Sequence, residues 1–166
     1  MLPLTRIAGW LDGLTIALSA VAAAMLAGTV ASYCYEVAAR FFFNAPTEWA
    51  NDVVTYLLAG AIFLAAPDVA RTGGHIAIAL LVERLGEARR AVVIRLLAAA
   101  STVATLGAAW IVGSEAIRQF EQDILTLGVH PIPKGLITGT VAFGLFLTAL
   151  QFLRHALLTA KPEEAR

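Results

Sequence analysis

Residues 13–35 read GLTIALSAVAAAMLAGTVASYCY and contain no charged side chain. A helix rises 1.5 Å per residue, so about 20 apolar residues cross the roughly 30 Å hydrocarbon core of a bilayer, and this stretch is long enough to do so. A cleaved signal peptide has a shorter apolar region behind a basic start, whereas only Arg6 precedes this one. The stretch therefore predicts an uncleaved signal anchor, which is the first membrane-spanning helix.

Three further uncharged stretches, 53–67, 96–114 and 135–153, predict three more spans. The composition agrees, because 59% of the 166 residues are hydrophobic and only 14% are charged. We therefore predict an all-α integral membrane protein that forms one domain over residues 1–166. Its four transmembrane helices are expected at about 11–35, 48–67, 90–114 and 133–155, and helical spacing allows the third to continue to 127.

The connection between the second and third spans predicts an additional short helix. Gly73 and Gly74 interrupt the chain, and apolar residues then recur at i, i+3, i+4 and i+7, which forms one stripe of a helix. Those residues are Ile78, Leu81, Val82 and Leu85. The run is too short and too charged to span, so we predict an amphipathic helix over about 75–86 that lies in the membrane interface or packs against a partner.

The distribution of basic residues predicts the orientation. Lys and Arg are retained on the cytoplasmic side, and most of them flank the termini and the second connection. These are Arg6, Arg71, Arg84, Arg89, Arg90, Arg154, Lys161 and Arg166, whereas the first and third connections carry only Arg40, Arg118 and Lys134. Both termini are therefore predicted to be cytoplasmic.

No pattern of reactive residues points to an enzyme. His75 and His130 fall on opposite sides of the bilayer, and His155 has no second ligand at metal-binding spacing. The sequence has no nucleophile elbow, phosphate loop or dinucleotide fingerprint. Twelve basic residues balance twelve acidic ones, which argues against nucleic acid. We predict no catalytic, metal-binding or substrate-binding residue and no cofactor.

Acidic residues at the start of the second span are the most informative polar positions. Glu48 and Asp52 are four apart and share one helix face, with Arg40 as the nearest preceding basic residue. Either they form a solvated helix start that suits the helix dipole, or Asp52 pairs with Arg40 or with another subunit. Trp49 lies between them and is typical of an aromatic anchor at the headgroup level.

Small residues recur at helical spacing in two spans, which either lets helices approach closely or reflects ordinary membrane composition. They are Ala20, Ala24, Gly28 and Ser32 in the first span, and Gly135 and Gly139 in the fourth.

Two segments carry a resemblance to a known family. The segment RFFFNAPTEW at 40–49, followed by Asp52, resembles the first connection of the small membrane subunit of tripartite ATP-independent periplasmic (TRAP) transporters, the DctQ-like family. The segment ARTGGHI at 70–76 resembles the second signature of that family.

The resemblance implies a three-part, sodium-coupled importer in the bacterial inner membrane. A periplasmic binding protein captures an organic anion, a large multispan permease subunit moves it, and the small subunit anchors and scaffolds the large one. The residues expected at the interface with these partners or with membrane lipids are Arg40, Glu48, Trp49, Asp52, Arg71, Gly74 and His75.

Three other readings compete with this one. A membrane enzyme or haem protein would need clustered His, Asp or Ser on one face, and no such cluster appears in the sequence. A stand-alone homo-oligomeric channel would need a polar stripe through a span, and Ser101, Thr102 and Thr105 come nearest to one. The chain is also compatible with another kind of accessory membrane subunit.

Overall fold

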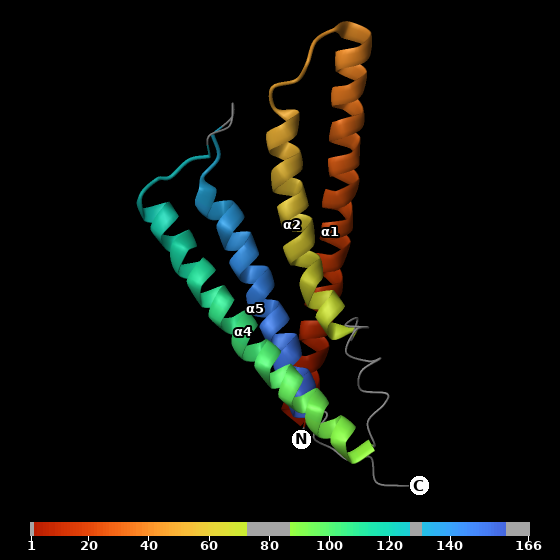
Figure 1. The fold of residues 1–166 in the computed structure, drawn as a ribbon, viewed down its shortest axis with the longest axis vertical. Coiled ribbons are helices and arrows are strands. Elements are labelled where there is room, and N and C mark those ends of the chain that lie inside the picture. The colour runs from red at the N-terminus through yellow and green to blue at the C-terminus, as the bar shows by residue number, and fades with distance from the viewer. Residues whose placement is uncertain (1, 73–86, 127–130, 159–166) are drawn as a thin grey trace.

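The computed structural model describes residues 2–72, 87–126 and 131–158, and this part of the chain is almost entirely helical. Its only β-type pairing is an isolated bridge between Leu125 and Pro133. The all-α prediction is therefore confirmed. With the labels of Figure 1, the helices are α1 (Leu2–Phe43), α2 (Ala50–Arg71), α4 (Glu87–Glu121) and α5 (Lys134–Leu158).

All four helices are long and apolar enough to cross a membrane, as predicted. The qualifying segments are Gly9–Phe43, Ala50–Arg71, Val92–Glu121 and Lys134–Leu157. Helix α1 extends beyond the predicted 11–35 at both ends, since charged residues such as Asp12 and Glu36 limit the hydrocarbon-facing part of a helix without ending the helix itself. The interfacial helix predicted at 75–86 lies outside the described residues.

The helices form two antiparallel hairpins, α1 with α2 and α4 with α5, and α2 packs against α5 to join them. Figure 1 shows that the hairpins converge where α1 begins and α5 ends, and diverge toward the opposite side. We call the first side the terminal end. The second side is the connection end, because it carries residues 44–49 between α1 and α2, and residues 122–126 and 131–133 between α4 and α5.

Small residues set the closest helix contacts. A Cβ atom added at Gly144 of α5 would lie 2.7 Å from the carbonyl carbon of Phe63 in α2, so these two backbones meet directly. In α1, Gly28 belongs to the predicted small-residue stripe and faces Leu57 of α2. A Cβ atom added at Gly28 would lie 3.3 Å from Cδ1 of Leu57. In the predicted Gly135–Gly139 pair, a Cβ atom added at Gly135 would lie 2.7 Å from Cδ2 of Phe120 in α4, whereas Gly139 has nothing within 4 Å. Only the first glycine of this pair therefore lies in a close contact between helices.

Candidate functional site

The connection end of the first hairpin is organised by one carboxylate, that of Glu36. Only 8% of Glu36 is exposed. Its Oε1 accepts a hydrogen bond from Nη2 of Arg40 at 2.9 Å, and its Oε2 accepts from the backbone N–H of Thr47 at 2.8 Å and from the Thr47 hydroxyl. Glu36 therefore fastens the 44–49 connection back onto α1.

The backbone of this connection is irregular at both of its ends. Asn44 ends α1 with a φ of 50°, in the left-handed region, which Asn tolerates better than most residues. Helix α2 then begins without a side-chain cap, and its Ncap residue Trp49 stacks obliquely on Tyr35 with ring centroids 5.9 Å apart. The predicted anchor Trp49 is thus held between the two helices of the hairpin.

Arg40 forms its ion pair with Glu36, one helical turn earlier, at 2.9 Å. Within the described residues Arg40 forms no ion pair with Asp52, because its guanidinium binds Glu36 instead. Glu48 is exposed and Asp52 is half-buried at the start of α2. Sequence reasoning missed Glu36, although the i, i+4 spacing to Arg40 was available as a signal.

The second hairpin has its own polar network at the connection end. The Arg118 guanidinium donates to both carboxylate oxygens of Glu115, at 2.9 and 2.6 Å. Gln119 donates to Glu115 at 2.9 Å and accepts from the hydroxyl of Thr138 at 2.8 Å, which links α4 to α5. At the connection end, each hairpin is therefore held together by hydrogen bonds between its own residues.

At the terminal end, polar side chains join the two hairpins. Nη1 of Arg154 in α5 donates to Oδ1 of Asp12 in α1 at 2.5 Å. One turn deeper, Nε2 of Gln151 donates to the hydroxyl of Thr15 at 3.0 Å, and both residues are only 1% exposed. These partners are more than 130 residues apart, so no short-range pattern in the sequence predicts the contacts.

Helix α2 joins this network through its last turn. Nε2 of His155 lies 3.2 Å from the carbonyl oxygen of Arg71, within hydrogen-bonding distance. The Arg71 side chain pairs with Asp68 at 2.9 Å. Of the predicted terminal-end interface residues, Arg71 is thus placed at the junction of α2 and α5, whereas Gly74 and His75 lie outside the described residues.

The buried Thr15–Gln151 bond gives a testable prediction. Thr15→Val preserves the side-chain shape but leaves the Gln151 amide without its acceptor, so the variant should lose about 1–3 kcal/mol of stability. The double variant Thr15→Val/Gln151→Leu should recover most of this loss, because both polar partners of the bond are then removed. It also removes Oε1 of Gln151, a buried atom that has no hydrogen-bond partner within the described chain. Thermal unfolding of the purified variants in detergent measures both effects, and equal melting temperatures for wild type and Thr15→Val would refute the prediction.

The middle of the bundle lacks the polar groups that a solute path would need. The hydroxyls of Thr102 and Thr105, in the stripe considered for a channel, donate to the carbonyls of Ala98 and Ser101 in their own helix, at 2.8 and 2.6 Å. Within the described residues, no group of three or more His, Cys, Asp or Glu side chains is placed to hold a metal ion. The Thr102 and Thr105 hydroxyls therefore satisfy the backbone of their own helix and do not form a polar stripe toward a path through the bundle.

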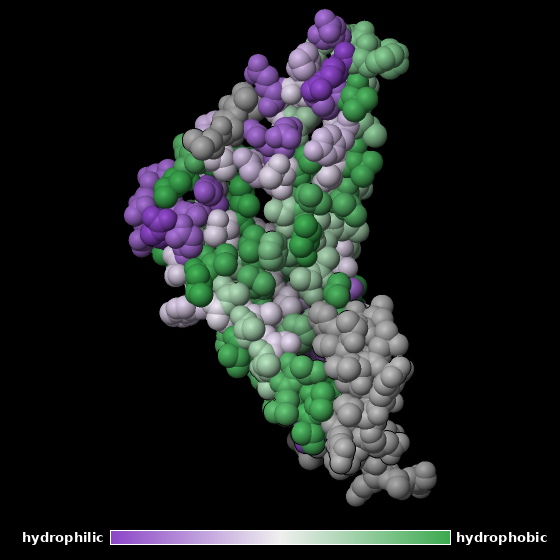
Figure 2. Space-filling model, in the orientation of Figure 1, coloured by the Kyte–Doolittle hydropathy of each residue, from purple (hydrophilic) through white to green (hydrophobic). Residues whose placement is uncertain are grey.

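Many large apolar side chains instead face outward. Figure 2 shows hydrophobic residues covering most of the visible length of the helices, with hydrophilic residues gathered toward the connection end. Trp110 near the middle of α4 is 80% exposed, for example. A surface of this kind suits lipid or the apolar face of another membrane protein.

A comparison with protein families decides what this helical bundle is. The family described as "Tripartite ATP-independent periplasmic transporters, DctQ component" matches residues 29–161. The chain belongs to the DctQ family. Comparison with curated proteins and with solved structures gives no match.

As a DctQ protein, the chain is the small permease subunit of a TRAP transporter and a multi-pass protein of the bacterial inner membrane. The region matched to the family includes the Glu36–Arg40–Thr47 network and the whole 44–49 connection. It leaves out Asp12 and Thr15, so the α1 side of the terminal-end network lies outside the matched region.

Proposed function

We propose that this DctQ chain anchors and scaffolds the large permease subunit of a sodium-coupled TRAP transporter that imports an organic anion delivered by a periplasmic binding protein. One observation carries the proposal. The helices keep their charges at the two ends, and residues 13–35, 53–67, 96–114 and 135–153 are uncharged. An anion or a sodium ion crossing the membrane requires polar or charged groups within the spans, so the path belongs to another subunit.

The polar networks support the scaffolding part of this proposal. Glu36 closes the first hairpin and Gln119 closes the second, while the Asp12–Arg154 pair joins the two hairpins at the terminal end. Polar ties at both ends limit how far the helices can shift relative to one another. A partner whose transport domain moves needs a neighbour of this kind.

We also propose that both termini lie in the cytoplasm, together with Arg71 and the connection that follows it. The start of α1 and the end of α5 lie at the same end of the bundle, so one measurement reports on both (Figure 1). We expect alkaline phosphatase fused after residue 166 to be inactive and green fluorescent protein fused there to fluoresce. The reverse pattern would place the connection end in the cytoplasm.

Uptake in proteoliposomes tests the functional proposal. Vesicles that contain the large permease subunit with this chain, and that receive binding protein loaded with its anion, should accumulate the anion when a sodium gradient is imposed. Vesicles with the large subunit alone should accumulate little, because their transport domain lacks its anchor. Full sodium-driven uptake without this chain would overturn the scaffolding role.

A further inference from the structure

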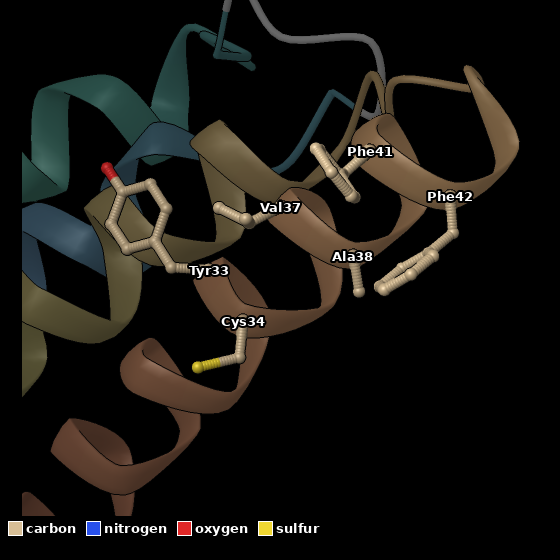
Figure 3. A pocket seen from close by; sticks show the side chains of 6 residues that line it. All are labelled: Tyr33, Cys34, Val37, Ala38, Phe41 and Phe42. Carbon is tan, nitrogen blue, oxygen red and sulfur yellow. The ribbon is translucent and has the colours of Figure 1, made fainter.

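The last turn of α1 carries three consecutive aromatic residues that the described part of the chain leaves uncovered. Phe41, Phe42 and Phe43, which we call the aromatic tip, are 80%, 75% and 78% exposed. Phe41 and Phe42 contact each other edge to face, with centroids 5.2 Å apart. Below them, α1 forms a shallow groove of about 390 Å³ (Figure 3), lined by Tyr33, Cys34, Val37, Ala38, Phe41 and Phe42.

Counted by helical rise from the uncharged stretch of α1, the tip is expected above the level that lipid chains reach. The uncharged stretch 13–35 already rises about 34 Å, which fills the roughly 30 Å hydrocarbon core. Glu36 and Arg40 then mark the boundary, and Phe42 follows Glu36 by about 9 Å of helical rise. The headgroup layer accounts for only about 5–7 Å on each side, so the aromatic tip stands at the edge of the water.

The rest of the bundle does not reach around the tip. Figure 1 shows α1 rising past the start of α2, and Figure 2 shows hydrophobic side chains continuing to this end of the molecule beside hydrophilic ones. Trp49 reaches α1 only two turns before Phe42, where its ring contacts Tyr35. A contiguous aromatic surface at the edge of the water is typical of a protein interface.

We propose that the aromatic tip of α1, with the groove below it, is a docking surface for the large permease subunit. The choice of partner follows from the chemistry of the surface and rests on the proposed function. A binding protein must dock and leave in each cycle, and interfaces that form transiently are polar enough to be exposed between encounters. A permanent partner can keep three phenylalanines covered, because permanent interfaces resemble a protein core.

Cysteine labelling tests the docking surface directly. Phe42→Cys is made in a Cys34→Ala background, so that position 42 carries the only thiol of the chain. Membrane fragments open on both faces are treated with a membrane-impermeant maleimide, with and without the co-expressed large subunit. We expect rapid labelling without the large subunit and protection of about tenfold or more with it, since an interface core excludes water.

Glu121→Cys in the same background is the matched control. Glu121 is exposed at the connection end of the other hairpin, and its labelling without the large subunit establishes that the reagent reaches this end. Equal labelling of position 42 with and without the large subunit would overturn the proposal. So would the absence of labelling in both preparations while position 121 reacts, because the tip would then lie in lipid.

Two further outcomes separate this inference from the proposed function. Protection of position 42 only after addition of the binding protein would assign the surface to that partner and overturn the inference. If the large subunit co-purifies with this chain while position 42 stays reactive, the scaffolding role stands and the docking surface lies elsewhere. If the large subunit does not co-purify at all, both proposals fail.

A substitution at the tip provides a second readout. Phe42→Asp places a charge within the proposed interface and should reduce the recovery of the large subunit in mild detergent about tenfold. Glu121→Lys, which changes charge away from the tip, should leave recovery unchanged. Equal recovery in the Phe42→Asp variant would contradict the proposal.

Discussion

Of the glycine-to-alanine substitutions at the glycines that the structure describes, Gly144→Ala is expected to destabilise the bundle most. The new Cβ would lie 2.7 Å from the carbonyl carbon and 3.1 Å from the Cβ of Phe63 in α2. Backbone atoms cannot move aside as a flexible side chain does, so α2 and α5 have to separate, and overpacking of this kind costs about 1–3 kcal/mol or more. Because α2–α5 packing joins the two hairpins, the loss affects the whole fold.

Gly139→Ala is the control, because it adds the same methyl group to the same helix where nothing lies within 4 Å. Alanine favours a helix over glycine by about 1 kcal/mol, so this variant should be as stable as the wild type or slightly more stable. Thermal unfolding in detergent should separate the two variants by several degrees. Equal melting temperatures would contradict the described contact between Gly144 and Phe63.

Glu36→Ala should loosen the first connection. The substitution leaves the Thr47 N–H and the Arg40 guanidinium without the carboxylate that binds them, and the left-handed turn at Asn44 loses its fastening. We expect a lower melting temperature and faster proteolysis between residues 44 and 49. Glu36→Gln should have an intermediate effect, since its amide oxygen can still accept one of these hydrogen bonds.

Glu48→Ala is the matched control in the same connection. Glu48 is exposed, and the described residues offer its carboxylate no hydrogen bond, so its removal should leave both stability and proteolysis close to wild type. If Glu36→Ala and Glu48→Ala behaved alike, the network around Glu36 would not hold the connection in solution.

The sequence was sufficient to predict the four spans, because uncharged stretches such as 13–35 and 96–114 satisfy the length that a bilayer imposes. The segments 40–49 and 70–76 were sufficient to indicate the family. Helix ends were harder to place. Charged residues such as Asp12 and Glu36 set the edge of the hydrocarbon, but the helix continues through them wherever its backbone hydrogen bonds are satisfied.

Long-range contacts could not be predicted from a single sequence. Nothing near Gln151 indicates Thr15 as its partner, since the two are brought together only when α5 packs beside α1. The same holds for Gly144, which has no second glycine four residues away, whereas Gly139 has Gly135 at that spacing and yet has open space around it. The Glu36–Arg40 pair, by contrast, has a local signal, because the two residues are four apart in one helix.

The most direct test of the scaffolding role is the composition of the complex. The tagged chain, expressed with its transporter subunits in their own membrane, is purified in mild detergent and weighed by native mass spectrometry. We predict one copy of this chain bound to one copy of a large multispan permease subunit. Recovery of this chain alone as a homo-oligomer would contradict the account and would favour a stand-alone channel.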